Sequence, residues 1–453
     1  MVFFFRLLVS LILLGLYSVL FYLASGGFSL KRLNIFSLTY FYLLLFCFIG
    51  TAIVLCGFRN QYLILKCSEK TIEKTIWMIM YVLLSLPAFC LLFQYTLGIK
   101  NYRLFFDSYV KKETNCKPWE SDSVFILALI LGSLGFLAIC YSFYHIGSFP
   151  LWEYIKGNKG ILNEREVISR GFAGSQYIRN IFALCMVPNL SYLAYAYMRV
   201  TKQVKWRILF FALFVLSIIC KTYDFEKAPV ILYVFYFYLI EVLLGRIKSI
   251  KLFLAMAVGA VVFIIFIYIV VFGYSGNLIS ISTGPLARII MTQIATCFLH
   301  VEAFPRMVGF LKGSSFPTAL AWMFGSNESW IRSGRIVMEL FGTPTASGEV
   351  TGAMNSLFVA EAYANFGMGG VVFAPILIAF FITVVPNIIL MIRKDPINIS
   401  LYVIITSSYI GTLTGGFVDF FYNVDLVFIV LLFSMVKLFV NNGNWRQFAD
   451  LNC

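Results

Sequence analysis

The sequence predicts an all-α protein that crosses a membrane many times. Of its 453 residues, 61% are hydrophobic and only 12% are charged, and the mean hydropathy is +0.89. A soluble domain carries about 25% charged residues, so this composition excludes the soluble globular class. The 18% aromatic content is typical of lipid-facing Phe together with interfacial Tyr and Trp.

Apolar runs long enough to cross a bilayer predict about 11–12 spans, and we expect one membrane domain over 1–453. The first run starts close to Met1 without a basic segment before it, which favours an uncleaved first span over a signal peptide. The runs lie at 3–24, 35–57, 76–98, 124–146, 178–198, 206–220, 229–244, 252–273, 368–392, 399–417 and 424–440.

Two polar connections are long enough to hold a functional site. The first is 147–177, and the second is 274–367, between the spans 252–273 and 368–392. Three other connections are basic and contain no acid: MRVTKQVKWR, GRIKSIK and the IRK before Asp395. The positive-inside rule places these three in the cytoplasm, which puts both long connections outside.

The first half of the chain fits this orientation less well. Alternation of spans places the connection Arg59–Lys74 outside, although it holds four basic residues against two acids. It also leaves the N-terminus outside. A missed span, an invented span or a re-entrant segment would each explain the mismatch.

The net charge of +14 has two interpretations. One is positive-inside topology with attraction to anionic membrane lipid, and the other is binding of an anionic substrate. The cysteines lie mostly inside apolar runs, so we expect no disulfide framework. With two histidines and no clustered thiols, we expect no metal site and no haem. We also expect no other cofactor and no nucleic-acid partner. No phosphate loop or other soluble-enzyme motif is present.

The connection 147–177 carries arginines on its predicted external side. Arg165, Arg170 and Arg179 follow a plausible helix cap at Asn163. A surface helix with weak Glu–Arg pairs is one interpretation. The other is a diphosphate clamp, because guanidinium forks match phosphate oxygens in bidentate fashion. Lys227 lies at the start of a further span, where it could meet a lipid phosphate.

The connection 274–367 holds three candidate pieces. Arg288, Thr292, Thr296 and His300 recur at i+4 spacing and predict an amphipathic helix on the membrane or along a polar cavity. His300 is either a hydrogen-bonded packing residue or a functional one.

The second and third pieces are also predicted as helices. Arg332, Arg335 and Glu339 share one face, which is either solvated or anion-binding. One arc of the third predicted helix holds Thr351, Asn355, Glu361 and Asn365. Glu361 is either a general base or a packing residue bonded to Asn.

Three patches resemble the O-antigen (oligosaccharide repeat unit) polymerases of bacterial surface polysaccharide assembly. IGSFPLWEYI followed by Arg165 is similar to that family's Gly-x-Pro-Leu external loop with a downstream arginine. FEKAPVILYVFYFYL is similar to its basic residue before an aromatic span. FVAEAYANFGMGGVVFAPIL is similar to its acidic–Tyr–x–Asn–Phe–Gly entry to a late span.

The resemblance implies a membrane glycosyltransferase of GT-C-like architecture in the bacterial inner membrane, with its site facing the periplasm. It would transfer a growing glycan from undecaprenyl diphosphate onto an incoming undecaprenyl-diphosphate-linked oligosaccharide, with a chain-length-determining co-polymerase as partner. The expected base is Glu361, or else His300 or Glu349. The expected diphosphate-binding residues are Arg165, Arg170, Lys227, Arg288, Arg332 and Arg335.

Two other functions remain open at this point. An O-antigen ligase uses the same donor and relies on an external histidine, which His300 would supply. A lipid-linked oligosaccharide flippase would need charges inside the spans, and the spans hold few, with Arg6 and Glu241 near their ends.

Overall fold

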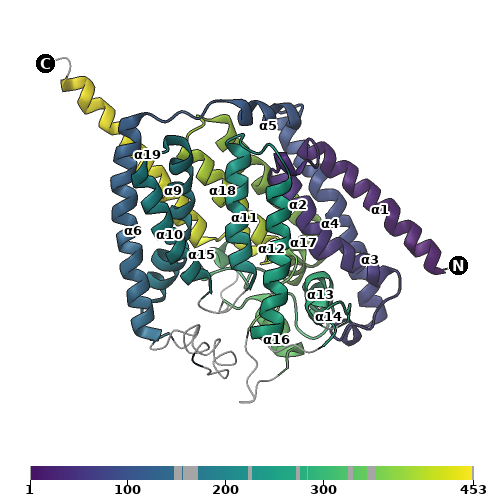
Figure 1. Cartoon of the computed structure of the whole chain (residues 1–453). Coiled ribbons are helices and arrows are strands. Elements are labelled where there is room, and N and C mark those ends of the chain that lie inside the picture. Colours follow the sequence, from purple (N-terminus) through teal and green to yellow (C-terminus); the bar gives the residue numbers. More distant parts are fainter. Residues whose placement is uncertain are drawn as a thin grey trace. The chain divides into compact units, whose positions relative to one another are not determined.

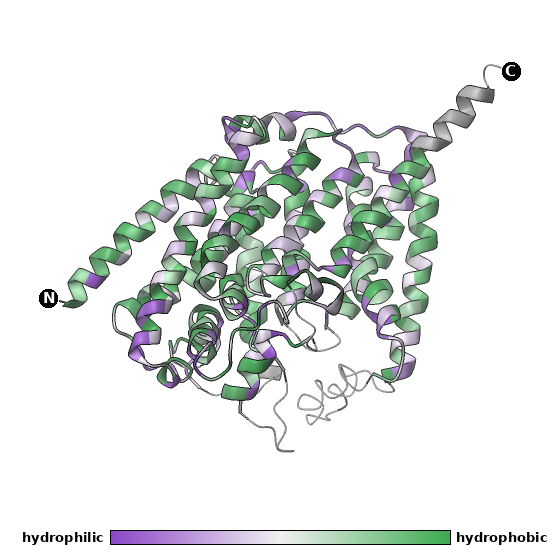
Figure 2. Ribbon diagram, turned by 180° about the vertical axis from the view of Figure 1, so that it is seen from behind, coloured by the Kyte–Doolittle hydropathy of each residue, from purple (hydrophilic) through white to green (hydrophobic). Residues whose placement is uncertain are grey.

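The protein is described here from a computed structural model covering residues 2–146, 156, 172–222, 227–271, 276–282, 284–324, 330–343 and 352–450. Within these ranges the secondary structure is helical throughout. Nine of the described helices are long and apolar enough to cross a membrane, so this is a multi-pass membrane protein. Figure 2 shows hydrophobic residues along the helices and hydrophilic residues mainly near helix ends and in connections.

Helices lie over every apolar run predicted from the sequence. Asn34 and Ser37 form the capping box that begins α2, with each side chain bonded to the other's backbone N–H. The helices are α1 (Val2–Ser25), α2 (Ile35–Leu43) continued by α3 (Ile49–Leu55), α4 (Glu69–Thr96), α6 (Pro118–Ile146), α9 (Val187–Thr201), α10 (Val204–Thr222), α11 (Lys227–Leu243), α12 (Lys251–Phe266), α17 (Phe358–Met391), α18 (Pro396–Thr412) and α19 (Val424–Asp450).

One candidate span was not predicted. Gly284–Ala303 is long and apolar enough to cross a membrane and lies within the expected long loop. It consists of α13 (Gly284–Ala287), a π-helical turn (Arg288–Thr292) and α14 (Gln293–Ala303). Every residue from Ile294 to Ala303 is buried. A helix lying on the membrane surface is therefore the wrong interpretation for α14.

The described chain divides into two compact units. Unit 1 comprises Met1–Phe106, Tyr268–Asn387 and Ser408–Asn423. Unit 2 comprises Asp107–Ile267, Ile388–Ser407 and Val424–Cys453. The expectation of a single membrane domain stays a prediction.

In unit 2, the three basic connections meet at one end. The helices α6, α9 and α10 run beside one another there (Figure 1). Arg246 donates to the backbone oxygen of Arg199 at 2.7 Å, which joins the connections after α9 and after α11. Arg393 of the third connection pairs with Glu120 at the start of α6. This common end agrees with placing all three connections on one side of a membrane.

In unit 1, the connection Arg59–Lys74 lies beside residues of the long loop. Lys66 Nζ donates to the backbone oxygen of Phe341 at 2.7 Å, at the C-terminus of α16 (Ser333–Phe341), where a cation is favourable. Glu302 accepts hydrogen bonds from the backbone and hydroxyl of Ser68. The helices α1, α2–α3 and α4 lie over the three spans predicted in this half. The orientation of the N-terminus stays a prediction.

A kink in α17 sets the position of its first two turns. Gly367 has φ +59°, a left-handed conformation that glycine adopts without a steric penalty. The kink frees the carbonyls of Ala364 and Asn365, and the backbone N–H groups of Leu311 and Lys312 bond to them at 2.9 and 3.0 Å. The segment Phe358–Phe366 is thus held by the long loop as a separate helical piece.

Candidate functional site

The strongest candidate site in unit 1 is an arginine held between two carboxylates. Arg332 Nε donates to Glu361 Oε1 at 2.8 Å and Arg332 Nη2 to Oε2 at 3.2 Å. Arg332 Nη1 donates to Asp419 Oδ1 at 2.7 Å. The backbone N–H of Val418 adds a fourth bond, to Glu361 Oε2 at 3.0 Å. The three charged side chains come from positions far apart in the sequence, and we call them the Arg332 cluster.

Three elements bring the Arg332 cluster together. Arg332 occupies the cap position before α16, with extended backbone, so its side chain leaves the helix at its end. Glu361 lies in the first turn of α17, whose start is fixed by a bond from Phe358 N to Leu413 O at 2.9 Å. Asp419 belongs to the short 3₁₀ turn Val418–Phe420 between α18 and α19.

The charges of the cluster do not cancel, since one guanidinium faces two carboxylates. The Glu361 side chain is only 5% exposed, whereas that of Asp419 is 30% exposed. Burial alone would lower the pKa of Arg332, but Glu361 and Asp419 raise it well above its usual value. A buried pair of this kind stabilises a fold little or not at all compared with apolar residues, so its presence suits a functional role.

The space beside the cluster is small. His300, Ser333, Asn355, Gly415 and Gly416 line it together with Arg332 and Glu361, and its volume is about 10 Å³. This is room for about one water molecule. A molecule larger than water can reach Glu361 only if the segments around it separate.

The other expected arginines of the long loop lie elsewhere. Arg335 Nε pairs with Glu339 Oε1 at 2.7 Å on the exposed side of α16, as the solvated-face interpretation predicts. Arg288 is exposed at the start of the π-helical turn. Among the contacts of the described residues, neither side chain forms a hydrogen bond or ion pair with the Arg332 cluster.

His300 is a buried, hydrogen-bonded residue of α14. Its Nδ1 lies 2.8 Å from the backbone oxygen of Thr296, so Nδ1 carries the proton. Its Nε2 lies 3.3 Å from the hydroxyl of Ser333 and accepts from it. Both ring nitrogens are therefore engaged, and the ring joins α14 to the start of α16.

We expect His300→Phe to destabilise the protein, because the histidine has a packing role. Phenylalanine keeps the ring but leaves the Ser333 hydroxyl and the Thr296 carbonyl without this partner, which costs about 1–3 kcal/mol. Thermal unfolding in detergent measures the loss, and Ser333→Ala should show a smaller one. A histidine with no packing role would instead leave the melting temperature unchanged in His300→Phe.

The predicted helix from Thr351 to Asn365 is wrong in its first part. The helix begins at Phe358, and Asn355 precedes it in an irregular segment. Asn355 accepts a bond through its backbone oxygen from Thr296 instead. Asn365 Nδ2 bonds the backbone oxygen of Glu361 at 2.9 Å, whereas the Glu361 carboxylate is taken by Arg332.

Several expected site residues lie outside the described part of the chain. They are Arg165, Arg170, Glu349, the cap Asn163 and Thr351. α11 begins at Lys227, as expected, but the side chain of Lys227 is also outside the described part. Arg179 is described: it is buried, with its guanidinium over the ring of Phe172 at 4.5 Å.

Asp419 is the member of the cluster that sequence reasoning missed. Two signals pointed to it. It lies in an external turn by the predicted topology, and it follows Gly415 and Gly416, a pair that permits close approach of backbone to other groups. Gly416 has φ +152°, and its α-carbon lies against Arg332 and Glu361.

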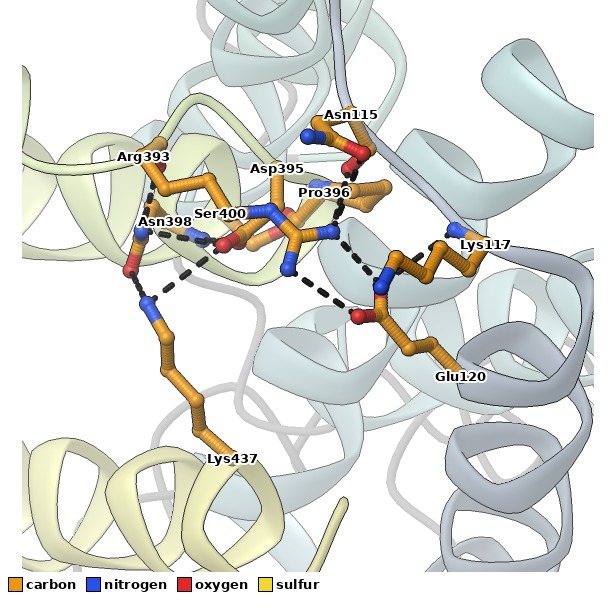
Figure 3. A network of polar contacts seen from close by, with 9 residues as sticks. All are labelled: Asn115, Lys117, Glu120, Arg393, Asp395, Pro396, Asn398, Ser400 and Lys437. Carbon is orange, nitrogen blue, oxygen red and sulfur yellow. Dashed lines mark hydrogen bonds and ion pairs between the residues drawn. The ribbon is translucent and has the colours of Figure 1, made fainter. Parts of the chain in front are cut away.

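Unit 2 holds a second polar network, at its basic end (Figure 3). Arg393 bonds both oxygens of Glu120, at 3.0 and 2.7 Å. Asn398 bonds the carboxylate of Asp395, and Lys437 of α19 reaches Asn398 at 2.9 Å. The network ties the starts of α6 and α18 to α19, which is a structural role.

Unit 2 also contains a half-polar cavity of about 250 Å³. Lys221 and Asp425, of opposite charge, line it together with Asn189, Tyr233 and Ser407.

Comparison of the chain with protein-family models, with curated proteins and with solved structures found no match.

Proposed function

We propose that this protein is a polymerase of oligosaccharide repeat units carried on undecaprenyl diphosphate, with a GT-C-like architecture. The observation that carries the proposal is the Arg332 cluster, which joins a buried carboxylate, a guanidinium and a half-exposed carboxylate. Transfer of a glycan from a diphosphate requires a base that takes the proton of the acceptor hydroxyl and a cation that stabilises the leaving diphosphate. The cluster contains both kinds of group. The three resemblance patches supply the substrate class.

The reaction needs little beyond these groups. The acceptor hydroxyl oxygen bonds to the anomeric carbon of the donor glycan, and the bond from that carbon to the diphosphate oxygen breaks. The diphosphate leaves with the electron pair, and the hydroxyl proton passes to the Glu361 carboxylate. Guanidinium groups stabilise the charge on the leaving diphosphate.

The cluster suggests how the base is kept inactive until substrate arrives. In the described structure Arg332 donates hydrogen bonds to both carboxylate oxygens of Glu361, at 2.8 and 3.2 Å, and its charge neutralises that of the carboxylate. A diphosphate carries more negative charge than one carboxylate and offers the same bidentate geometry, so it competes for the guanidinium. Arg332 would then move from Glu361 to the diphosphate and free the base, with Asp419 guiding it.

The buried environment of His300 favours the polymerase over the ligase. The ligase alternative rested on an external histidine, and both ring nitrogens of His300 are bonded within unit 1. The flippase alternative rested on charges inside spans. Glu241 pairs with Arg199 at 2.6 Å near the basic end of unit 2, which suits a structural ion pair.

The test is polymer formation by the purified, reconstituted chain. With the cognate undecaprenyl-diphosphate-linked repeat unit and no nucleotide sugar, we expect a ladder of products on a gel. Release of diphosphate carrier should match each added unit. If the protein instead moves glycan only to a lipid A–core acceptor, or only moves the lipid across the bilayer, the polymerase proposal fails.

A further inference from the structure

A groove on unit 1 lies between α4 and α17 and is lined almost entirely by apolar side chains. Its volume is about 300 Å³, at the lower end for ligand sites. One wall is a stripe of α4 at helical spacing, and the other is the part of α17 after the kink. Lys74 is one lining residue, and the others are Trp77, Met78, Tyr81, Met368, Val371 and Val372.

The groove opens on the lipid-facing side of the helices. Trp77 is 58% exposed and Met368 is 50% exposed, although both helices are apolar enough to cross a membrane. Trp and Tyr on such helices gather at the level of the lipid headgroups. The groove therefore lies where a lipid chain meets its headgroup.

A cation stands at one end of the groove. Lys74 is exposed, and its Nζ donates to the hydroxyl of Tyr363 at 2.7 Å. Tyr363, which accepts this bond, keeps its own proton to donate. An ammonium and a phenol hydroxyl at the end of an apolar groove fit a phosphate joined to a hydrocarbon chain.

We propose that this groove binds the first isoprene units of an undecaprenyl diphosphate carrier, with the diphosphate at Lys74. The carrier bound here is the one that holds the acceptor oligosaccharide. A single groove between two helices takes one chain, whereas a glycerophospholipid brings two. The choice of this carrier rests on the proposed function.

Helical geometry separates this site from the Arg332 cluster. Tyr363 follows Glu361 by two residues, about 200° around the helix, so the two side chains leave α17 on opposite faces. A helix with its side chains is about 10–12 Å across. The anomeric carbon of a donor is bonded directly to its diphosphate, so a donor in the groove would react far from Glu361. The reacting hydroxyl of an acceptor is at the other end of its repeat unit, and the intervening sugars can span the helix.

Direct binding tests the groove. The probes are undecaprenyl diphosphate and phosphatidylglycerol, measured by native mass spectrometry on the purified full chain. Lys74→Glu removes the cation and Val372→Trp fills the groove, and each should weaken undecaprenyl diphosphate binding roughly tenfold. The matched controls are Lys70→Glu, one turn earlier, and Phe373→Trp, which is 63% exposed beside the groove, and both should bind as wild type. Equal binding in all four variants, or the same loss for phosphatidylglycerol, overturns the carrier site.

Separated substrates test the assignment to the acceptor. A donor capped at its non-reducing sugar cannot accept, and an acceptor whose anomeric oxygen is replaced by methylene cannot donate. Val372→Trp should raise KM for this acceptor roughly tenfold and leave KM for the donor unchanged, because the tryptophan occupies the space of the acceptor's carrier. A raised donor KM overturns the assignment. A wild-type protein that forms a ladder while these variants behave normally refutes only the groove, whereas no ladder at all refutes the proposed function.

Discussion

Replacing Glu361 with glutamine is expected to slow polymer growth by roughly 10²–10⁴-fold, the usual contribution of a general base. Glutamine has the same shape and still offers an oxygen to Arg332 Nε or to Val418 N–H, but it cannot take the acceptor's proton. Arg332 keeps its bond to Asp419 at 2.7 Å, so the guanidinium does not lose its last counter-charge. The rate of ladder formation by reconstituted protein measures the effect.

The control is Glu339→Gln on α16. Glu339 pairs with Arg335 on an exposed surface, and such pairs contribute about 0–1 kcal/mol to stability. This variant should make polymer at the wild-type rate and melt at nearly the wild-type temperature. It has the same chemical change as Glu361→Gln, outside the cluster.

A structural role for Glu361 predicts a different pattern. If Glu361 only locks α17 to α16, Glu361→Gln should lower the melting temperature while the protein that remains folded polymerises normally. Removing the partner, in Arg332→Ala, leaves a carboxylate that is 5% exposed with one backbone donor. Breaking a buried pair in this way costs about 3–5 kcal/mol at most, less here because Arg332 is partly exposed. Stability and rate therefore have to be measured together.

The span pattern was predictable because it depends on local composition. Runs of apolar residues fold into helices in a membrane whatever their neighbours, since every backbone group must be bonded within the segment. The candidate span Gly284–Ala303 was missed because the prediction used only local composition and spacing. Its polar stripe, from Arg288 to His300, suggested a surface, but the π-helical turn shifts the spacing and other helices cover α14. Burial of both faces is a tertiary effect.

The candidate site was predictable only in part. Glu361 stood out as a carboxylate at the edge of an apolar span, and Arg332 as a cation on the expected external side. Their pairing was not predicted, because it depends on how three segments distant in sequence pack together. Asp419 was missed for this reason, although the glycines before it were visible. Arg165 and Glu349 stay predictions, since they lie outside the described residues.

The backbone beneath the cluster gives a test that changes no charged group. Gly416 has φ +152°, a conformation that side-chain-bearing residues rarely adopt, and a Cβ there would overlap Arg332 Nη2 and Glu361 Oε2. We expect Gly416→Ala to displace both side chains from the positions that catalysis uses and so to stop polymer growth, with a loss of stability of about 1–3 kcal/mol from strain and overpacking. Ladder formation and thermal unfolding measure the two effects.

Gly411→Ala is the matched control for Gly416→Ala. Gly411 lies in α18, and a Cβ there would meet no heavy atom within 4 Å. Alanine is favoured over glycine inside a helix by about 0.5–1 kcal/mol, so this variant should be as stable as wild type or slightly more so. Its polymer ladder should be normal. A normal ladder from Gly416→Ala as well would mean that the placement of Arg332 and Glu361 against Gly416 is not needed for catalysis, and the roles assigned to these two side chains would have to be abandoned.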